Sequence, residues 1–287
     1  MPYFYLISSV FLIASGSIFG SLYNRKNEGR NAVTFYNLII AISSLTLWGI
    51  VSLFSFKFHA KTLWYSLGFA ISYMLTNLSM ILALKHGPLS LTSLFFQLSL
   101  IGATIWGLIF WNEEVNILVI LGLIFSVVSI VFCLYQKRSS EEGRLNFKWV
   151  IFATLLFFAN VSCTVIQKTQ IRTYGEEYGN MLMLFAMLFA SVFSLIHFLV
   201  SSKKDIKIII KQSISFPILA GICNGLLNLF VILMATRLPS SVVYPVVSIG
   251  GLCVSIFASV FFFKEKLKRT QWIGVAFGLI SVLLLTL

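Results

Sequence analysis

Charged residues, and acidic ones above all, are scarce in this sequence. Only 10% of its 287 residues are charged, whereas an average soluble domain carries about 25%. Hydrophobic residues make up 59%, and the mean hydropathy is +0.95. A chain with so few polar groups cannot cover its surface for contact with water, so an ordinary soluble domain is excluded. Most of the surface must therefore face lipid.

Cysteine and histidine are also rare. The four cysteines each stand in a different apolar stretch: Cys133, Cys163, Cys223 and Cys253. No pair has the spacing of a metal or redox site, so we expect buried free thiols, no metal centre and no cofactor. A membrane-embedded enzyme needs a Ser/His pair, paired Asp residues or a His-rich metal set within its spans. Only His197 stands within an apolar run, so we expect no enzyme.

Long apolar runs are what the sequence has instead. Crossing the hydrocarbon layer takes about 20 residues per helix, and ten runs of roughly this length are separated by polar breaks. They cover residues 3–22, 34–56, 62–84, 89–111, 115–135, 149–168, 180–200, 216–236, 241–263 and 271–287. They lack the alternation of barrel strands, so we predict an all-α polytopic membrane protein with ten transmembrane helices. We expect no cleavable signal peptide, because the first run begins without a basic leader.

The net charge of +12 does not indicate nucleic acid, because the basic residues stand in loops and at the ends of runs. There they set the topology and contact anionic headgroups. Loops after odd-numbered runs hold 16 Lys and Arg residues, and the other loops hold 5. The positive-inside rule then places both termini outside the cytoplasm. Lys168, at the end of the sixth run, is expected to reach the headgroups or to meet an anionic substrate group.

The chain also repeats itself. A shift of 151 positions aligns residues 75–114 with 226–265 without a gap and gives ten identities. The informative identities pair rare residue types: Asn77 with Asn228, Pro88 with Pro239, and Glu114 with Glu265. Equal spacing of three rare residue types indicates an internal repeat.

The repeat predicts two halves joined by a polar linker. The first five-helix repeat covers residues 1–135, the linker 136–148 and the second repeat 149–287. Because each half has an odd number of spans, the second enters the membrane in the opposite orientation. Inverted repeats are a device of secondary transporters.

This layout resembles the drug/metabolite transporter superfamily, particularly its EamA-type ten-helix members. The resemblance rests on the ten spans and on a turn with proline before the fourth and ninth spans (Lys85-His86-Gly87-Pro88 and Arg237-Leu238-Pro239). It rests also on a Glu after those spans, in Trp111-Asn112-Glu113-Glu114 and Phe263-Lys264-Glu265-Lys266. It implies membrane transport of a small molecule. It also implies termini inside the cytoplasm, opposite to the charge rule.

All nine carboxylates stand in loops or at the ends of runs. A proton-driven exporter of lipophilic cations usually needs a carboxylate at mid-membrane, so a small four-helix multidrug antiporter is not expected. Glu114 and Glu265 are instead expected to cap the next helix, where negative charge favours the dipole.

Neutral polar side chains recur within the runs. An amide facing lipid is costly, so each is expected to face the interior, either as an interhelical hydrogen bond or as the lining of a cavity. Taken together, they favour a central polar cavity between the halves. The candidate substrate-binding residues are Tyr73, Asn77, Ser93, Gln97, Asn160, Gln167, Asn224, Asn228, Tyr244 and Ser248. Pro245, Gly250 and Gly251 are candidate kink or gating positions.

The sequence therefore predicts an alternating-access transporter in a bacterial inner membrane, exporting or exchanging a small polar or zwitterionic metabolite such as an amino acid. One alternative cargo is a choline-like amine held by cation–π contacts, with Tyr36, Trp48, Trp106 and Tyr244 as candidates. A non-transporting receptor or scaffold is the other alternative. We expect a monomer in the lipid bilayer, with a homodimer through the Gly274–Gly278 pattern of the last span as a second option.

Overall fold

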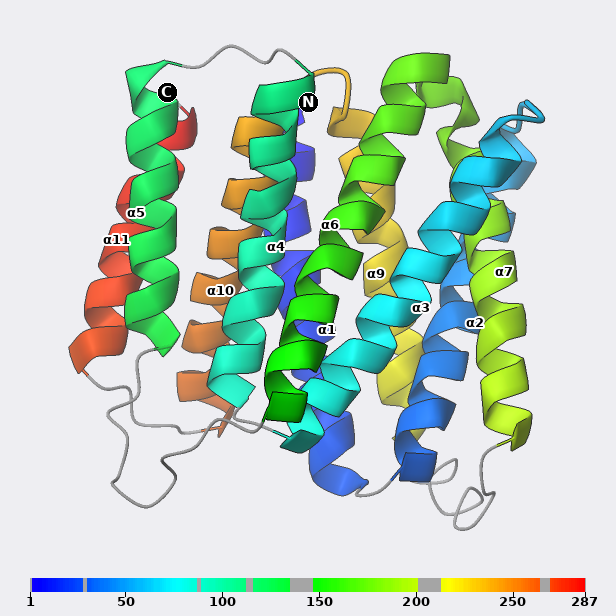
Figure 1. Cartoon of the computed structure of the whole chain (residues 1–287), viewed down its shortest axis with the longest axis horizontal. Coiled ribbons are helices and arrows are strands. Elements are labelled where there is room, and N and C mark those ends of the chain that lie inside the picture. Colours follow the sequence, from blue (N-terminus) through cyan, green and yellow to red (C-terminus); the bar gives the residue numbers. More distant parts are fainter. Residues whose placement is uncertain are drawn as a thin grey trace. The chain divides into compact units, whose positions relative to one another are not determined.

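The computed structural model describes residues 2–27, 30–86, 89–111, 116–134, 147–200, 213–263 and 269–286. Within them every element of regular secondary structure is a helix (Figure 1). The helices are α1 (Pro2–Lys26), α2 (Arg30–Phe54), α3 (Thr62–His86), α4 (Leu89–Phe110), α5 (Ile117–Leu134), α6 (Phe147–Tyr174), α7 (Gly179–Val200), α9 (Ser215–Met234), α10 (Ser240–Phe263) and α11 (Arg269–Thr286). The 3-10 turn η1 (Glu176–Tyr178) precedes α7.

Each of the ten predicted spans coincides with one helix, because a helix satisfies its own backbone hydrogen bonds where no water is present. On the described residues alone, α1, α2, α6, α9 and α7 with its preceding turn are long and apolar enough to cross a membrane. The described parts of α4, α5, α10 and α11 contain shorter apolar stretches. The predicted all-α class is confirmed.

The helices form two compact units, and each unit draws on both halves of the sequence. Unit 1 comprises Met1–Met74 and Ile166–Arg237, and unit 2 comprises Leu75–Val165 and Leu238–Leu287. Helices α3 and α6 therefore pass from one unit into the other. The boundaries of the halves, drawn from the repeat, stay a prediction.

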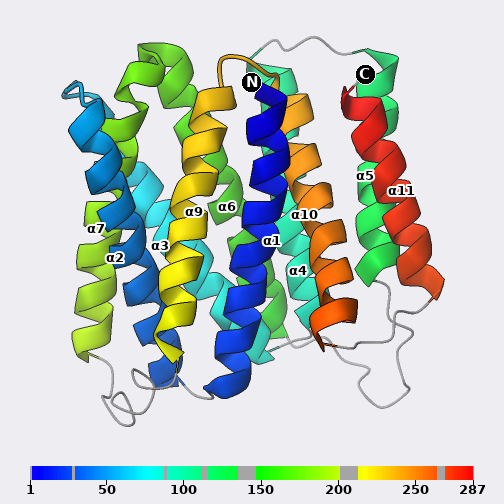
Figure 2. The ribbon, with the colours of Figure 1, turned by 180° about the vertical axis from the view of Figure 1, so that it is seen from behind.

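In unit 1, α2 contacts both α7 and α9, and α9 lies beside α1 (Figure 2). The contact between α2 and α9 is close because it is made at Gly221. A Cβ atom at that position would lie 2.7 Å from Ser43 Cβ and 2.8 Å from the Ile40 carbonyl oxygen. The Ser44 hydroxyl donates to the Gly221 carbonyl at 2.8 Å. Only glycine allows two helices to approach so closely.

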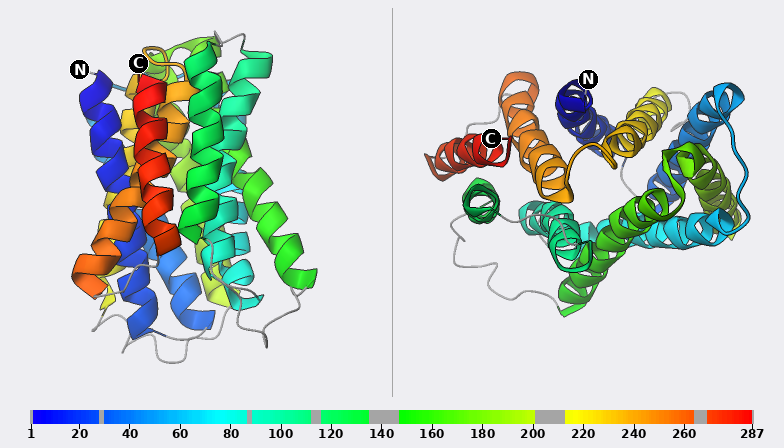
Figure 3. Two further views of the ribbon diagram at one scale, coloured as in Figure 1. Left: turned by 90° about the vertical axis from the view of Figure 1, so that its left-hand side faces the viewer. Right: turned by 90° about the horizontal axis from the view of Figure 1, so that it is seen from above.

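In unit 2, α5 and α11 lie side by side and are joined by hydroxyl groups (Figure 3). The Ser126 and Ser281 hydroxyls are 2.8 Å apart and buried. The Ser129 hydroxyl donates to the Gly274 carbonyl at 2.7 Å. A Cβ atom at Gly278 would lie 2.8 Å from Ser129 Oγ. The small-residue pattern of the last helix is thus used for packing within the chain.

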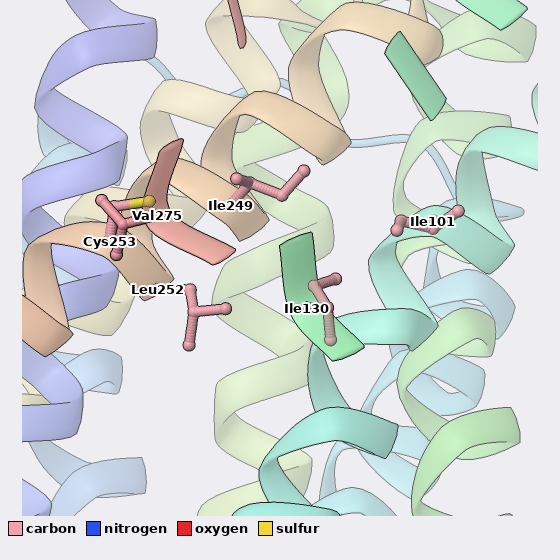
Figure 4. Close-up of a cluster of buried hydrophobic side chains, with 6 residues drawn as sticks. All are labelled: Ile101, Ile130, Ile249, Leu252, Cys253 and Val275. Carbon is pink, nitrogen blue, oxygen red and sulfur yellow. The ribbon is translucent and has the colours of Figure 1, made fainter. Parts of the chain in front are cut away.

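Unit 2 also contains an apolar cluster contributed by α4, α5, α10 and α11 (Figure 4). Its members are Ile101, Ile130, Ile249, Leu252, Cys253 and Val275. Lipid tails are as apolar as these side chains, so the cluster stabilises the unit through close packing rather than through exclusion of water. Cys253 and Cys163 are buried free thiols as expected, whereas Cys223 is partly exposed.

Removal of the hydroxyls of Ser126 and Ser281 is expected to show modest coupling between α5 and α11. In a double-mutant cycle with Ser126→Ala and Ser281→Ala, the coupling should be about 0.6 kcal/mol, the average for such bonds in membranes. The measurement is unfolding of the purified protein by SDS in mixed micelles. Ser162→Ala is the control, because the Ser162 hydroxyl donates to the Phe158 carbonyl of its own helix. Strictly additive effects of the two serine variants would contradict the prediction.

Candidate functional site

Three candidate residues of unit 1 form a hydrogen-bonded string of amides. Gln167 Nε2 on α6 donates to Asn228 Oδ1 on α9 at 3.4 Å. Asn228 Nδ2 in turn donates to the Asn224 side-chain oxygen at 3.3 Å and to the Asn224 backbone carbonyl at 2.9 Å. Gln167 Nε2 also lies 3.7 Å from the sulfur of Met183 on α7. We call Gln167, Asn228 and Asn224 the amide string.

The sequence explains half of this arrangement. Asn224 and Asn228 are four residues apart, so they lie on the same face of α9. Gln167 is only 2% exposed, so its amide is held inside the protein rather than in lipid. At the two ends of the string stand the Asn224 amide nitrogen, which can donate a hydrogen bond, and the Gln167 amide oxygen, which can accept one. The string therefore carries no charge and ends in one donor and one acceptor.

Further polar groups are buried elsewhere in unit 1. Gln170 Nε2 donates to Thr62 Oγ1 at 3.4 Å, while Gln170 Oε1 is buried without a partner among the described residues. The indole nitrogen of Trp48 is likewise buried without a partner in this part of the chain. Buried polar atoms of this kind require an explanation, such as a water molecule or a ligand. Lys168 is 2% exposed, so its side chain is enclosed by protein, and its contact with headgroups or with a substrate stays a prediction.

Aromatic residues of α1, α2 and α3 come together in the same unit. The rings of Tyr23 and Tyr36 have centroids 4.7 Å apart. On α3, Tyr73 stacks on Phe69 with centroids 6.3 Å apart. These two aromatic pairs include two of the candidate positions, Tyr36 and Tyr73.

In unit 2, Asn160 Nδ2 on α6 donates to the Ser99 hydroxyl on α4 at 2.6 Å. The backbone carbonyl of Asn160 accepts a bond from the Thr164 hydroxyl at 3.3 Å. Asn77 is partly buried on α3 and has its own partner. Asn160 is therefore an interhelical bond donor, as its position in an apolar helix predicts.

Helix α10 contributes two buried candidates and the kink positions. Tyr244 is 3% exposed and Ser248 is fully buried, and each has a partner. Pro245 stands inside the helix, where its missing N–H leaves the carbonyl four residues earlier without a helical donor. Gly250 and Gly251 lie one turn further along the same continuous helix.

Several predicted residues lie outside the described part of the chain. These are the side chains of Ser93 and Gln97 and the residues Glu114 and Glu265. Their roles stay predictions. Trp106 is 39% exposed and stacks on Phe110 with centroids 4.2 Å apart. Of the aromatic candidates, Tyr36 and Trp48 belong to unit 1, and Trp106 and Tyr244 to unit 2.

Sequence reasoning missed a group of polar contacts at one end of unit 1. The Lys57 ammonium pairs with the Glu177 carboxylate. Glu176 accepts a hydrogen bond from the Thr236 hydroxyl, and its Oε2 lies 3.9 Å from Arg237 Nη2. η1 is thereby tied to the loop after α2 and to the end of α9. The sequence signal was weak, because each of these residues is an ordinary loop residue.

More contacts tie the same segments. Asn180 Nδ2 donates to the Ser55 carbonyl at 2.8 Å and to its hydroxyl oxygen at 2.7 Å. The His59 ring lies 4.5 Å from the Tyr174 ring and 5.2 Å from the Tyr178 ring. Between α6 and η1, Gly175 adopts a φ of 103°, which glycine tolerates at a helix end. We call these contacts around η1 the polar clasp.

The Lys57–Glu177 pair gives the clasp a defined response to alkaline pH. The hydrogen bond and charge of Glu177 raise the pKa of the exposed Lys57 ammonium above its ordinary value. A raised lysine pKa adds stability that is fully present at neutral pH and is lost as pH rises through the folded-state pKa. Wild-type protein should therefore lose slightly more thermal stability than Lys57→Met between neutral and strongly alkaline pH. Equal losses in melting curves of the two proteins would contradict the ion pair.

Taken together, ten apolar helices with amides and hydroxyls buried between them define a multi-pass membrane protein. Comparison with known families shows to which family the chain belongs. The sequence model of the EamA-like transporter family matches residues 1–135 and 147–287. The chain therefore belongs to this family of transporters.

The individual relatives and structures that match support the fold, but their names give no substrate. An uncharacterized protein of Haemophilus influenzae is 25% identical over 194 residues. That alignment covers 65% of this chain and 62% of the relative. A protein crystal structure matches with a TM-score of 0.72 over 100% of this chain and 98% of its own, at 13% identity. This likeness supports the fold alone.

Proposed function

We propose that this chain carries a small polar or zwitterionic metabolite, such as an amino acid, across a bacterial inner membrane. It acts as an exporter or exchanger by alternating access around a central polar cavity. The predicted binding residues of both units serve the cargo, and the amide string is the part with the clearest geometry.

The amide string is the observation that supports this proposal best. Amides inside apolar helices are retained only where they bond to protein or face a polar space. The string bonds to protein along its length, and its two ends are a donor group at Asn224 and an acceptor group at Gln167. A ligand that both accepts and donates hydrogen bonds matches these ends, and a neutral site suits a cargo without net charge. No carboxylate stands inside an apolar run to bind a lone cation.

A second candidate cargo is a quaternary amine such as choline. The aromatic pairs Tyr23–Tyr36 and Phe69–Tyr73 favour it, because a cation within about 6 Å of a ring centroid is attracted to the ring face. Tyr36→Leu should then weaken transport of the amine and leave transport of amino acids little changed.

Flux into liposomes tests the proposal. Purified protein is reconstituted, and uptake of a panel of amino acids, neutral metabolites and choline is compared with that of empty liposomes. Accelerated flux of an amino acid or similar neutral solute is the expected result. Flux of choline alone supports the second candidate. No accelerated flux of any solute contradicts the proposal and favours a receptor or scaffold.

A further inference from the structure

Helix α6 carries a second buried amide close to the amide string. Gln170 stands three residues after Gln167, so the two side chains leave the same face of α6 about one turn apart. Tyr174 stands four residues further and continues this face towards η1. Gln170 is fully buried, yet its Oε1 accepts no hydrogen bond from any residue that the structure describes. A buried acceptor in this state calls for a water molecule or a ligand.

A second buried polar atom belongs to the residue that lies across from Gln170. Gln170 Nε2 donates to Thr62 Oγ1 at 3.4 Å, and the Thr62 backbone N–H donates to the His59 carbonyl at 2.9 Å. His59 Nδ1 is buried and has no partner within the described ranges. The His59 ring lies 4.5 Å from the Tyr174 ring and 5.2 Å from the Tyr178 ring. Both residues that bond Thr62 therefore present an unsatisfied polar atom, next to two tyrosine rings.

The chemistry of these atoms matches a primary ammonium group. Gln170 Oε1 can only accept hydrogen bonds, and His59 Nδ1 accepts one when the neutral ring carries its proton on Nε2. A primary ammonium has three N–H donors and no acceptor. The faces of aromatic rings attract a cation within about 6 Å as well. A ligand that brings N–H donors and a positive charge satisfies all of these groups.

Nearby charges leave this role to hydrogen bonds and ring faces. Glu177 is paired with Lys57, and Glu176 Oε2 lies 3.9 Å from Arg237 Nη2, so neither carboxylate is free for a ligand. Lys168 stands two residues before the buried amide, so its side chain leaves α6 about 200° away around the helix axis, and it has its own partner. An amine held without a carboxylate can be released again, as transport requires.

We propose that Gln170 Oε1 and His59 Nδ1 form a second subsite of unit 1, which binds the primary ammonium group of the cargo. The subsite lies about one turn of α6 from Gln167, on the side of η1, where it meets a cargo on its way to or from the amide string. This inference rests on the proposed function and narrows it. The carried metabolite has an amine with N–H donors and is not a quaternary amine.

Transport of methylated amino acids tests the subsite. Initial flux into liposomes is measured for the amino acids of the panel, from glycine to phenylalanine, and for the N,N,N-trimethyl derivative of each. Trimethylation keeps the positive charge and removes every N–H donor. Wild-type protein should prefer the primary amine about tenfold or more in kcat/KM. In Gln170→Leu this preference should fall to about threefold or less, chiefly through a higher KM for the primary amine.

Two further variants separate binding from packing. Thr62→Val is the matched control, because it breaks the same bond between α3 and α6 but leaves Gln170 Oε1 in place. Its preference for the primary amine should stay within about twofold of the wild-type value. His59→Phe keeps a ring against Tyr174 and removes Nδ1, so it should lower the preference about threefold. This variant decides the matter if Gln170→Leu does not fold.

The contrary outcomes are distinct. An unchanged preference in Gln170→Leu, or in His59→Phe if the first variant does not fold, would overturn the subsite and indicate that water satisfies these atoms. An equal loss in Thr62→Val would overturn it in favour of packing. Equal flux of primary and trimethylated forms in wild-type protein, or flux of choline alone, would overturn the subsite while transport itself stands. If wild-type protein carries no solute of the panel, the proposed function fails and the subsite falls with it.

Discussion

Replacement of Asn228 by Leu is expected to lower transport about tenfold to a hundredfold, because it removes the central member of the amide string. Leu leaves Gln167 Nε2 without its partner on α9 and removes the bonds to Asn224. A lost bond to a buried polar group costs about 1–3 kcal/mol, and each 1.4 kcal/mol corresponds to a tenfold change. The measurement is initial flux per folded molecule in liposomes.

The design separates a binding role from a packing role. Thr173→Val is the matched control, since the Thr173 hydroxyl donates to the Thr169 carbonyl of its own helix. Gln167→Leu should lower flux about as much as Asn228→Leu does. The double variant should be little worse than either single variant, because all three variants break the same amide string. If Asn228→Leu lowers the melting temperature as severely as flux, the string is a structural bond between helices. If flux is unchanged, the string has no role in transport.

The second large effect is expected from Gly221→Ala. The new methyl group would meet Ser43 Cβ at 2.7 Å and the Ile40 carbonyl at 2.8 Å, and backbone cannot move aside as a flexible side chain does. Overpacking of this kind costs about 1–3 kcal/mol. Helices α2 and α9 should separate, the bond between Ser44 and the Gly221 carbonyl should weaken, and the protein should unfold at a lower temperature.

Glycines with free space supply the control. A Cβ atom at Gly49 on α2, or at Gly16 on α1, meets nothing within 4 Å. Gly49→Ala and Gly16→Ala should therefore leave stability unchanged or raise it slightly, because Ala is favoured over Gly in a helix interior. Thermal unfolding of all three variants in the same detergent decides the matter. Equal melting temperatures for Gly221→Ala and Gly49→Ala would show that α2 and α9 are not in close contact.

The spans were predictable from the sequence because the lipid environment imposes a simple rule of length and hydropathy. The residues at which the helices end were less predictable. The sequence predicts that the sixth span ends at Lys168, but α6 continues to Tyr174. A charged residue marks the edge of a span only when it faces lipid or water, and Lys168, Gln170 and Ile171 are all 2% exposed or less.

The partners of the polar residues were not predictable in the same way. Spacing placed Asn224 and Asn228 on one face, and the structure joins them by a hydrogen bond. Nothing in the sequence indicated that Gln167, 61 residues before Asn228, would be the next member. Helical periodicity reports which face of a helix a residue occupies, whereas the neighbour it meets depends on packing between helices. The contacts of the polar clasp were not predictable for the same reason, because they join segments that are distant in the sequence.

The interleaving of the two units has a consequence for biosynthesis. Unit 1 contains Ile166–Arg237, so its last helix is made well before the end of the chain. Unit 2 needs α10 and α11, which are translated last. Helices α4 and α5 therefore enter the bilayer before α10 and α11, their partners in unit 2, have been made. A nascent chain stalled after Arg237 should hold an assembled first unit beside an incomplete second unit, open to capture by membrane quality-control proteases.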